Sequence, residues 1–253
     1  MKSYAENPAG LKHDLLIVFK GFSGEQDWSE YHQLVLQYSH QALCVSDRGY
    51  DIRPYFIVAR KFNYRYLCFL NSYSIILDHD WLQKLYAQIS KSGVGLAAAT
   101  GSYESHYTNV LNMERAGVSE PFYRRLKGYL RLKLYQAYFD PFPNYHLRTN
   151  AFIISRDLMC CIYCHPLWRK LDAHRFESGK NSLTRQIVRR RLRVLVVGKD
   201  GRGYEKEEWC KSKTFAQGRQ ENLLIADNKT QEYSESDDEA KKLRTQMVWG
   251  HYA

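Results

Sequence analysis

Short apolar runs alternate with longer helical stretches along most of this chain, and this alternation constrains the fold most strongly. The first run, Leu15 to Phe19, is uninterrupted and ends before Gly21, as expected for a strand buried on both faces. We expect further strands over residues 43–45, 66–70, 95–100, 151–155 and 194–197, and helices over 28–38, 52–62, 80–90, 156–163 and 182–191. Such strand–helix–strand alternation predicts an α/β fold, with a mainly parallel central sheet flanked by helices.

Residues 111–139 form a different kind of segment, which is basic, aromatic and helical in pattern. Two interpretations are open. A helix of this composition can lie in the interface of a membrane. It can also pack on its own domain while its cations face solvent, which is the interpretation we favour. The sequence Asp140-Pro141-Phe142-Pro143-Asn144 is expected to end the helix.

The chain has 253 residues, of which 44% are hydrophobic, so it can bury a substantial core. No clear linker divides it. We therefore expect a single domain over 1–253, with a first half at about 11–110 and a second at about 140–227. Because 228–239 is polar and acidic, we expect 228–253 to be a C-terminal tail. Asp80 is expected to cap the helix that follows it.

The net charge of +10 attracts anions, including nucleic acids, acidic lipid surfaces and the diphosphate of a nucleotide sugar. No segment reaches the roughly 18 apolar residues of a membrane span, and residues 1–10 do not resemble a signal peptide. Most cysteines lie in apolar runs, which favours a reducing compartment. We expect a cytoplasmic protein, with the inner face of the cytoplasmic membrane as an alternative.

The turn after the second expected strand is the first candidate binding site. It reads Val45-Ser46-Asp47-Arg48-Gly49-Tyr50-Asp51-Ile52, so that a strand ends in a carboxylate, a glycine follows, and a helix begins. Ligands of open parallel sheets bind beyond the carboxyl ends of the strands. A carboxylate there can accept hydrogen bonds from a nucleobase or a ribose. By itself, however, the pattern also fits a simple helix cap with a turn glycine.

The next strand, Tyr66-Leu67-Cys68-Phe69-Leu70, is followed by Asn71-Ser72-Tyr73-Ser74, and Asp78-His79-Asp80-Trp81-Leu82 then opens a helix. In this order of motifs the sequence resembles the GT-A glycosyltransferases, especially the family-2-like enzymes of bacterial polysaccharide synthesis. The resemblance runs from about Leu15 to Asp227. It implies a GT-A (Rossmann-like) domain that binds a nucleotide sugar through Lys20, Gly21, Asp47, Gly49, Asp51, Asn71, Ser72 and Tyr73.

The family's acidic D-x-D motif, which holds a divalent ion on the sugar diphosphate, is replaced here by Asn71-Ser72-Tyr73. Amide and hydroxyl oxygens bind Mg²⁺ or Mn²⁺ more weakly than carboxylates do. Three alternatives are open. Other groups hold a metal near Asn71 and Tyr73, cationic side chains stabilise the diphosphate instead, or the activity has been lost.

The second half of the chain continues the resemblance. The sequence around Arg148, Thr149 and Asn150 leads into a buried strand and looks like the family's acceptor-side strand. Glu177 stands where inverting members carry the general base, with Asp172 as the reserve candidate. The acceptor-binding residues that the resemblance implies are Arg148, Thr149, Asn150, Phe176 and Trp209.

The implied function is transfer of a sugar, with inversion, from a UDP-, GDP- or dTDP-linked donor to a glycan or lipid-linked polysaccharide precursor of the bacterial cell envelope. Two alternatives belong to other classes. One is a catalytically inactive GT-A-like binding protein, suggested by the missing D-x-D. The other is a basic RNA-binding or membrane-surface-binding protein. We expect no nucleic-acid partner, because no recognised nucleic-acid module accompanies the basic residues.

Overall fold

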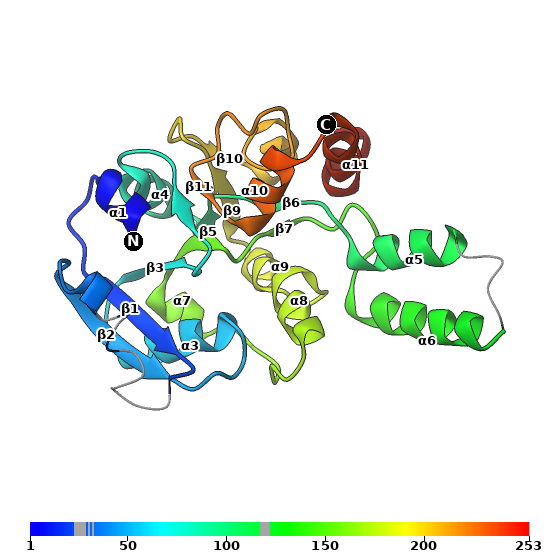
Figure 1. Ribbon diagram of the computed structural model, residues 1–253, viewed down its shortest axis with the longest axis horizontal. Helices are drawn as coiled ribbons and strands as arrows, with labels where there is room; N and C mark the ends of the chain where they lie inside the picture. Colours follow the sequence, from blue (N-terminus) through cyan, green and yellow to red (C-terminus); the bar gives the residue numbers. More distant parts are fainter. Residues whose placement is uncertain (23–28, 30, 32, 117–121, 253) are drawn as a thin grey trace.

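The structure is a computed structural model that describes residues 1–22, 29, 31, 33–116 and 122–252. At its centre is a five-stranded sheet with the strand order β10-β9-β5-β8-β3 (Figure 1). The strands are β3 (Tyr66–Leu70), β5 (Val94–Ala98), β8 (Ala151–Ser155), β9 (Arg193–Val197) and β10 (Gly203–Tyr204). The chain therefore has the expected α/β architecture.

The expectation of a mainly parallel sheet is wrong, because the central sheet is mixed. β8 lies between β3 and β5 and is antiparallel to both, β10 is antiparallel to β9, and β5 and β9 are parallel. The reason lies in the route of the chain before β8. β7 (His146–Leu147) pairs antiparallel with β6 (Gly101–Ser102), which follows β5. The chain thus enters β8 from the end of the sheet at which β3 and β5 finish.

The first two strands form a separate sheet. β1 (Leu15–Lys20) and β2 (His40–Val45) are parallel, and their register runs from Leu15 opposite His40 to Lys20 opposite Val45. Leu16, Val18 and Val45 pack against the main hydrophobic core. Of the helix expected over 28–38, residues 29, 31 and 33–35 are helical and residues 36–38 form a turn and a bend, while residues 28, 30 and 32 lie outside the described residues.

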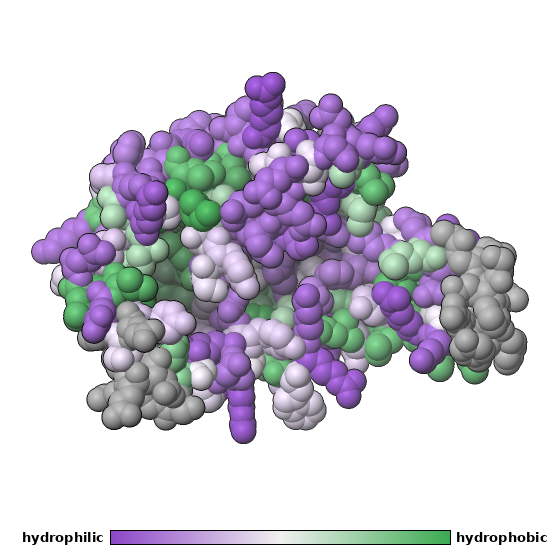
Figure 2. Space-filling model, viewed as in Figure 1, coloured by the Kyte–Doolittle hydropathy of each residue, from purple (hydrophilic) through white to green (hydrophobic). Residues whose placement is uncertain are grey.

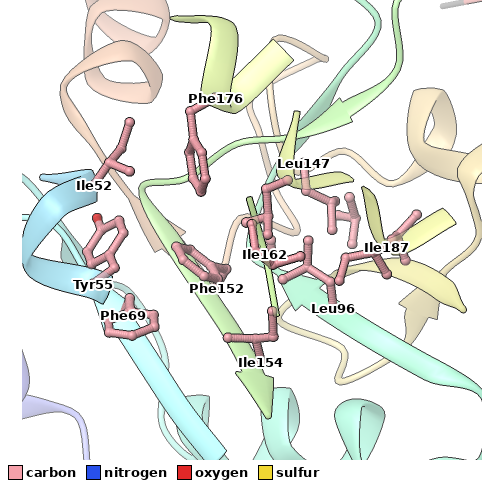
Figure 3. Packing of buried hydrophobic residues seen from close by; sticks show 14 of the residues in the cluster. Ile52, Tyr55, Phe69, Leu96, Leu147, Phe152, Ile154, Ile162, Phe176 and Ile187 are labelled. Carbon is pink, nitrogen blue, oxygen red and sulfur yellow. The ribbon is translucent and has the colours of Figure 1, made fainter. Parts of the chain in front are cut away.

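Helices cover both faces of the central sheet. They are α3 (Ile52–Lys61), α4 (Trp81–Ile89), α7 (Arg156–Cys160), α8 (Lys170–Ser178) and α9 (Leu183–Arg189), whereas α1 (Lys2–Glu6) contacts β4 (Ile75–Ile76), outside this sheet. Side chains of a strand alternate between its faces, and β8 follows this rule. Phe152 and Ile154 belong to the core cluster that includes residues of α3, α8 and α9 (Figure 3). Ala151 and Ile153 join the cluster of α4 on the other face.

Asp80 holds the N-cap position of α4, but its side chain does not cap the helix. Its backbone is in the left-handed region, with φ of 56°. The N–H groups at the start of α4 instead find partners in the N-terminal segment, since Asp80 donates to the carbonyl of Pro8 at 2.8 Å and Gln83 to that of Ala9 at 3.0 Å. The N-terminal segment therefore takes the place of the expected side-chain cap.

The basic aromatic segment consists of two helices rather than one. α5 (His106–Ala116) and α6 (Phe122–Tyr138) lie side by side and project from the body, on the right of Figure 1. We call this pair the helical arm. Among the described residues, no helix is both long enough and apolar enough to cross a bilayer.

The expected C-terminal tail is folded, which corrects the interpretation of 228–253. It contains α10 (Asn228–Glu235), α11 (Asp238–Trp249) and a 3-10 turn (Gly250–Tyr252), after η1 (Lys206–Lys211) and β11 (Ile225–Ala226), which pairs with β4 (Ile75–Ile76). The polar residues of 228–239 lie mostly on the outer faces of α10 and α11 while Tyr233 is buried. Trp249 is fully buried and donates from its indole N–H to the carbonyl of Phe215 at 2.8 Å.

Replacing Trp249 with alanine tests whether this C-terminal segment stabilises the fold. Truncation of a fully buried tryptophan leaves a cavity, so we expect a loss of about 3–5 kcal/mol in the free energy of unfolding. Leu243→Ala on the same helix is the control. Leu243 is 59% exposed, and its truncation should change stability by less than about 0.5 kcal/mol. Equal urea midpoints for the two variants would contradict a folded C-terminal segment.

Candidate functional site

The ends of two central strands converge on the turn formed by Thr149 and Asn150. Asn71, which follows β3, donates its backbone N–H to the carbonyl of Asn150 at 2.9 Å, and Ser74 Oγ donates to the same carbonyl at 3.1 Å. Thr100, which follows β5, donates from Oγ1 to Asn150 Oδ1 at 2.9 Å. Side chains beyond the carboxyl ends of neighbouring strands form the usual ligand site of an α/β sheet. We call this place the strand-end turn.

Asn150 has an unused hydrogen-bond donor. Its side chain is 4% exposed, and its Nδ2 finds no partner within the part of the chain that the structure describes. A buried donor without a partner costs about 1–3 kcal/mol, and such groups need a specific explanation. A ligand that accepts a hydrogen bond would satisfy it.

Tyr55 joins the helix after β2 to the strand-end turn. Its hydroxyl donates to the carbonyl of Thr149 at 3.1 Å, and its ring lies 4.6 Å from that of Phe69 (Figure 3). Burial raises the pKa of Tyr55, and the negative charges of Asp51 and Glu177 raise it further. Asp51 and Glu177 are far apart in the sequence, yet both raise the pKa of the same tyrosine.

Glu177 lies in the last turn of α8 and is half-buried. One of its oxygens, Oε2, accepts a hydrogen bond from Thr149 Oγ1 at 2.7 Å. This bond fixes the carboxylate at the strand-end turn and leaves Oε1 for another partner. The predicted base and two of the predicted acceptor residues, Thr149 and Asn150, are thus brought together.

Three histidines near Glu177 were not predicted from the sequence as functional residues. We call His106, His146 and His174 the histidine cluster. They come from α5, β7 and α8, and the rings of His106 and His174 are 4.5 Å apart. The backbone carbonyl of Asn144 can only accept a hydrogen bond, so His146 Nδ1, 2.8 Å away, must carry the proton. In the neutral ring the lone pair is then on Nε2.

The cluster is electrostatically coupled to Glu177. Burial lowers the pKa of each of the three histidines, while the charge of Glu177 acts in the opposite direction on all of them. Burial prevails, which favours the neutral imidazoles. No sequence motif joins three single histidines on three elements. Their one local signal is that His146 stands two residues before Arg148 in the predicted polar turn.

The structure brings together the predicted residues at the ends of β1 and β2. Lys20 Nζ lies 2.7 Å from Asp47 Oδ1. Gly21 has φ of +85°, and a Cβ there would lie 3.0 Å from Cβ of Asp47, so this close approach favours glycine. Gly49 also has a positive φ of +73°. Asp51 precedes α3, and its side chain makes no cap hydrogen bond.

Asn71 closes a turn with its own side chain. Its Oδ1 accepts hydrogen bonds from Tyr73 N at 3.1 Å and from Ser74 Oγ at 3.0 Å. Ser72 and Tyr73 are exposed, and Tyr73 lines a shallow hollow with residues of α10 that include Asn228. Among the described residues, no three His, Cys, Asp or Glu side chains are grouped to hold a metal ion. This turn does not fit the Mn²⁺ or Mg²⁺ that the resemblance implies.

Phe176 and Trp209 were expected to bind an acceptor, but both are core residues. Phe176 is 1% exposed and its ring lies 5.7 Å from that of Phe56. Trp209 is fully buried, and its indole N–H donates to the carbonyl of Tyr204 at 3.0 Å. Because both side chains are buried, they pack in the core and have no exposed surface for an acceptor.

Arg148 is also not free to bind an acceptor. Its guanidinium pairs with Asp227, with 2.5 Å between Nη2 and Oδ2, and lies over the ring of Phe215 at 4.2 Å. Asp227 is 2% exposed and caps α10 by accepting from the backbone N–H of Thr230 at 2.9 Å. The pair therefore ties the strand-end turn to the C-terminal segment.

Asp172, the reserve base, caps α8. Its Oδ2 accepts from the backbone N–H groups of Trp168 at 3.1 Å and Arg169 at 2.9 Å, and its Oδ1 pairs with Arg175. Burial alone would raise the pKa of Asp172, but these hydrogen bonds outweigh burial and lower it. Its contacts therefore give Asp172 a structural role.

No protein-family model matches this sequence, and comparisons with curated proteins and with solved structures find no match.

Breaking the pair between Arg148 and Asp227 should destabilise the protein strongly. Asp227→Asn leaves the guanidinium buried without a counter-charge, which costs about 3–5 kcal/mol. Burial would raise the pKa of Asp227, but Arg148 and Thr230 lower it overall. The stabilisation is therefore present above the ordinary aspartate pKa of 3.8 and is lost as the pH falls through the lower pKa of Asp227 in the folded state.

The control for this variant is Asp157→Asn. Asp157 is 92% exposed and pairs with Arg156 on the surface, and such pairs contribute less than about 1 kcal/mol. Denaturant unfolding at neutral and acidic pH measures both variants. If both lose the same small amount of stability, Arg148 and Asp227 do not form a buried ion pair.

The histidine cluster should make folding sensitive to mild acid. A histidine whose folded-state pKa is lowered binds fewer protons than it does in the unfolded chain, so stability rises with pH in this range. For His146 the stabilisation is present above the ordinary histidine pKa of 6.5 and is lost as the pH falls through its lower folded-state pKa. His146→Gln should flatten the pH dependence of the unfolding free energy below about 6.5, whereas His79→Gln, at an exposed histidine, should not. Parallel pH profiles for wild type and His146→Gln would be the contrary result.

Proposed function

We propose that this chain is a glycosyltransferase that moves a sugar from a nucleotide-sugar donor to a hydroxyl of a glycan or lipid-linked acceptor, with inversion at the anomeric carbon. In this proposal the mixed sheet and the sheet of β1 and β2 together form a variant of the GT-A architecture. The donor is UDP-, GDP- or dTDP-linked, and the setting is synthesis of a bacterial envelope polysaccharide at the cytoplasmic side of the membrane.

One observation carries the proposal. Residues from three separate motifs meet at the strand-end turn, where Asn71 bonds to Asn150, Tyr55 bonds to Thr149, and Thr149 bonds to Glu177. Asp51 acts on Tyr55 from the side of the expected nucleotide turn. A structural core does not need a half-buried carboxylate and a buried amide without a partner at one place, whereas a ligand site does.

Each part of the nucleotide sugar has side chains in this region that can bind it. Carboxylates of Asp47 and Asp51 can accept hydrogen bonds from a base or a ribose. Lys20, which pairs with Asp47 on the surface, and Arg53, which donates to Ser46 Oγ, add positive charge to this region together with Arg48, and this charge favours the diphosphate. Asn150 Nδ2 supplies a buried donor for a sugar hydroxyl or a phosphate oxygen. No step of this proposal goes through a metal ion.

The chemical step needs one base. Glu177 takes the proton of the acceptor hydroxyl while that oxygen attacks the anomeric carbon of the sugar. The bond between the anomeric carbon and the phosphate oxygen breaks, and the nucleoside diphosphate leaves with the electron pair. Attack on the face opposite the leaving group inverts the anomeric centre. Thr149 holds Oε2 of the carboxylate, so Oε1 is the atom that faces the acceptor in this scheme.

Glu177→Gln tests the assignment because it keeps the shape of the side chain and removes the base. We expect the rate of sugar transfer to fall by about 10²–10⁴-fold, while the dissociation constant of the nucleotide sugar changes by less than about twofold. Release of nucleoside diphosphate is measured with UDP-, GDP- and dTDP-sugars and a panel of acceptors, both with Mn²⁺ and with a chelator.

The matched control is Glu239→Gln, at an exposed glutamate of α11, which should transfer sugar at the wild-type rate. Full activity of Glu177→Gln would remove Glu177 from the mechanism. Nucleotide-sugar binding by the wild type without turnover on any acceptor would favour the inactive binding protein, an alternative that the engaged Asn71 oxygen supports.

A further inference from the structure

One face of α6 in the helical arm is apolar and exposed. Leu126, Leu130 and Leu134 recur at every fourth residue and are 51%, 61% and 42% exposed. Tyr129 adds a ring that is 56% exposed. At 100° per residue these side chains lie on one side of the helix. We call them the arm stripe.

The opposite side of α6 packs within the arm. Gly128 is buried, and a Cβ there would collide with the side chain of Glu114 on α5. Leu132 and Tyr135, on the same side as Gly128, are partly buried. The arm stripe is therefore not the face that holds the two helices together, and no described element of the chain covers it. In Figure 2 hydrophobic and hydrophilic side chains lie next to each other on the arm.

Cations lie beside the stripe and within it. At 100° per residue Lys127 and Arg131 follow one edge, and Lys133, whose Nζ lies 5.5 Å from the centre of the Tyr129 ring, falls between Tyr129 and Leu126. Lys127, Arg131 and Lys133 are exposed, and none of them forms an ion pair within the part of the chain that is described. The sequence of α6 contains five Lys or Arg residues and no Asp or Glu. An exposed apolar face that carries cations without ion-pair partners beside and within it complements the surface of an anionic bilayer, in which acyl chains lie beneath negative head groups. A second copy of this chain would bring the same cations against each other.

We propose that the arm stripe docks the protein onto an anionic membrane surface, with α6 lying in the head-group region. The leucines enter the boundary of the acyl chains, and Lys127, Arg131 and Lys133 contact the negative lipid phosphates. This docking does not depend on the proposed sugar transfer.

The base of the arm lies next to the candidate site, so docking would bring that site close to lipid. Lys180 donates its backbone N–H to the carbonyl of Tyr138 at 2.8 Å, and His106 at the start of α5 belongs to the histidine cluster. If the proposed transfer is correct, a lipid-linked acceptor is the substrate class that this placement favours. The docking and the sugar transfer are tested independently, because vesicle binding is measured without any donor or acceptor.

Sedimentation with vesicles tests the docking. Full-length protein is mixed with vesicles of phosphatidylcholine alone or with about a third phosphatidylglycerol. We expect binding to the anionic vesicles that weakens as salt is added. Replacing Leu126, Leu130 and Leu134 together with Gln should weaken this binding by more than about tenfold. Replacing Lys127, Arg131 and Lys133 together with Glu should abolish the preference for anionic lipid.

Matched triple variants control for exposed residue type. Leu36, Leu77 and Leu243, which are 59%, 40% and 59% exposed, are replaced together with Gln. Lys12, Lys211 and Lys242, which are exposed, are replaced together with Glu. The leucine control should bind vesicles as the wild type does, and the lysine control should keep most of the anionic preference. Thermal unfolding identifies any variant that fails to fold. If the leucine variant does not fold, the charge-reversal variant still tests the proposal.

Three outcomes would overturn the proposal. The first is no binding of the wild type to anionic vesicles beyond that to neutral ones. The second is an equal loss of binding in the arm variants and their matched controls. The third is a wild-type dimer in light scattering that the leucine variant converts to a monomer, because a second copy of the chain would then cover the stripe.

Discussion

The hydrogen bonds at Thr149 and Asn150 are the contacts on which the rest of the candidate site depends. The carbonyl oxygen of Asn150 accepts a hydrogen bond from the backbone N–H of Asn71, which follows β3. The side-chain Oδ1 of Asn150 accepts one from Thr100, which follows β5. The carbonyl oxygen of Thr149 accepts a hydrogen bond from the hydroxyl of Tyr55 in α3, and the hydroxyl of Thr149 donates one to Glu177. Without this turn, the ends of the strands and the carboxylate would have no common point. The ion pair between Arg148, next to this turn, and Asp227 joins the C-terminal segment to the same region.

The antiparallel entry of β8 places the turn where it can make these contacts. Because β8 runs against β3 and β5, its first residues lie beside the last residues of both neighbours. A parallel strand would put its amino end at the opposite edge of the sheet. The mixed sheet is thus the reason that a loop entering a strand, rather than a loop leaving one, carries Thr149 and Asn150.

Much of the fold could be predicted from the sequence, and the site only in part. Apolar runs placed β3 over Tyr66–Leu70 and β8 over Ala151–Ser155, because buried strands need such runs. The direction of β8 could not be predicted, since periodicity says nothing of pairing. The polar stretch 228–239 was misinterpreted because amphipathic helices expose polar residues and bury only a few, such as Tyr233. Phe176 and Trp209 were expected to contact the acceptor because a resemblance between motifs does not reveal burial. The histidine cluster could not be predicted because its members come from three separate elements.

The central claim is that the strand-end turn and the turns after β1 and β2 form one site for a sugar nucleotide. A crystal structure of the protein with a bound nucleoside diphosphate sugar tests it most directly. We expect that the nucleoside lies against Asp47 and Asp51, that Asn150 Nδ2 donates to the ligand, and that the anomeric carbon faces Glu177. A nucleotide sugar bound elsewhere on the molecule, or an Asn150 amide that stays unpaired when the ligand is bound, would contradict it.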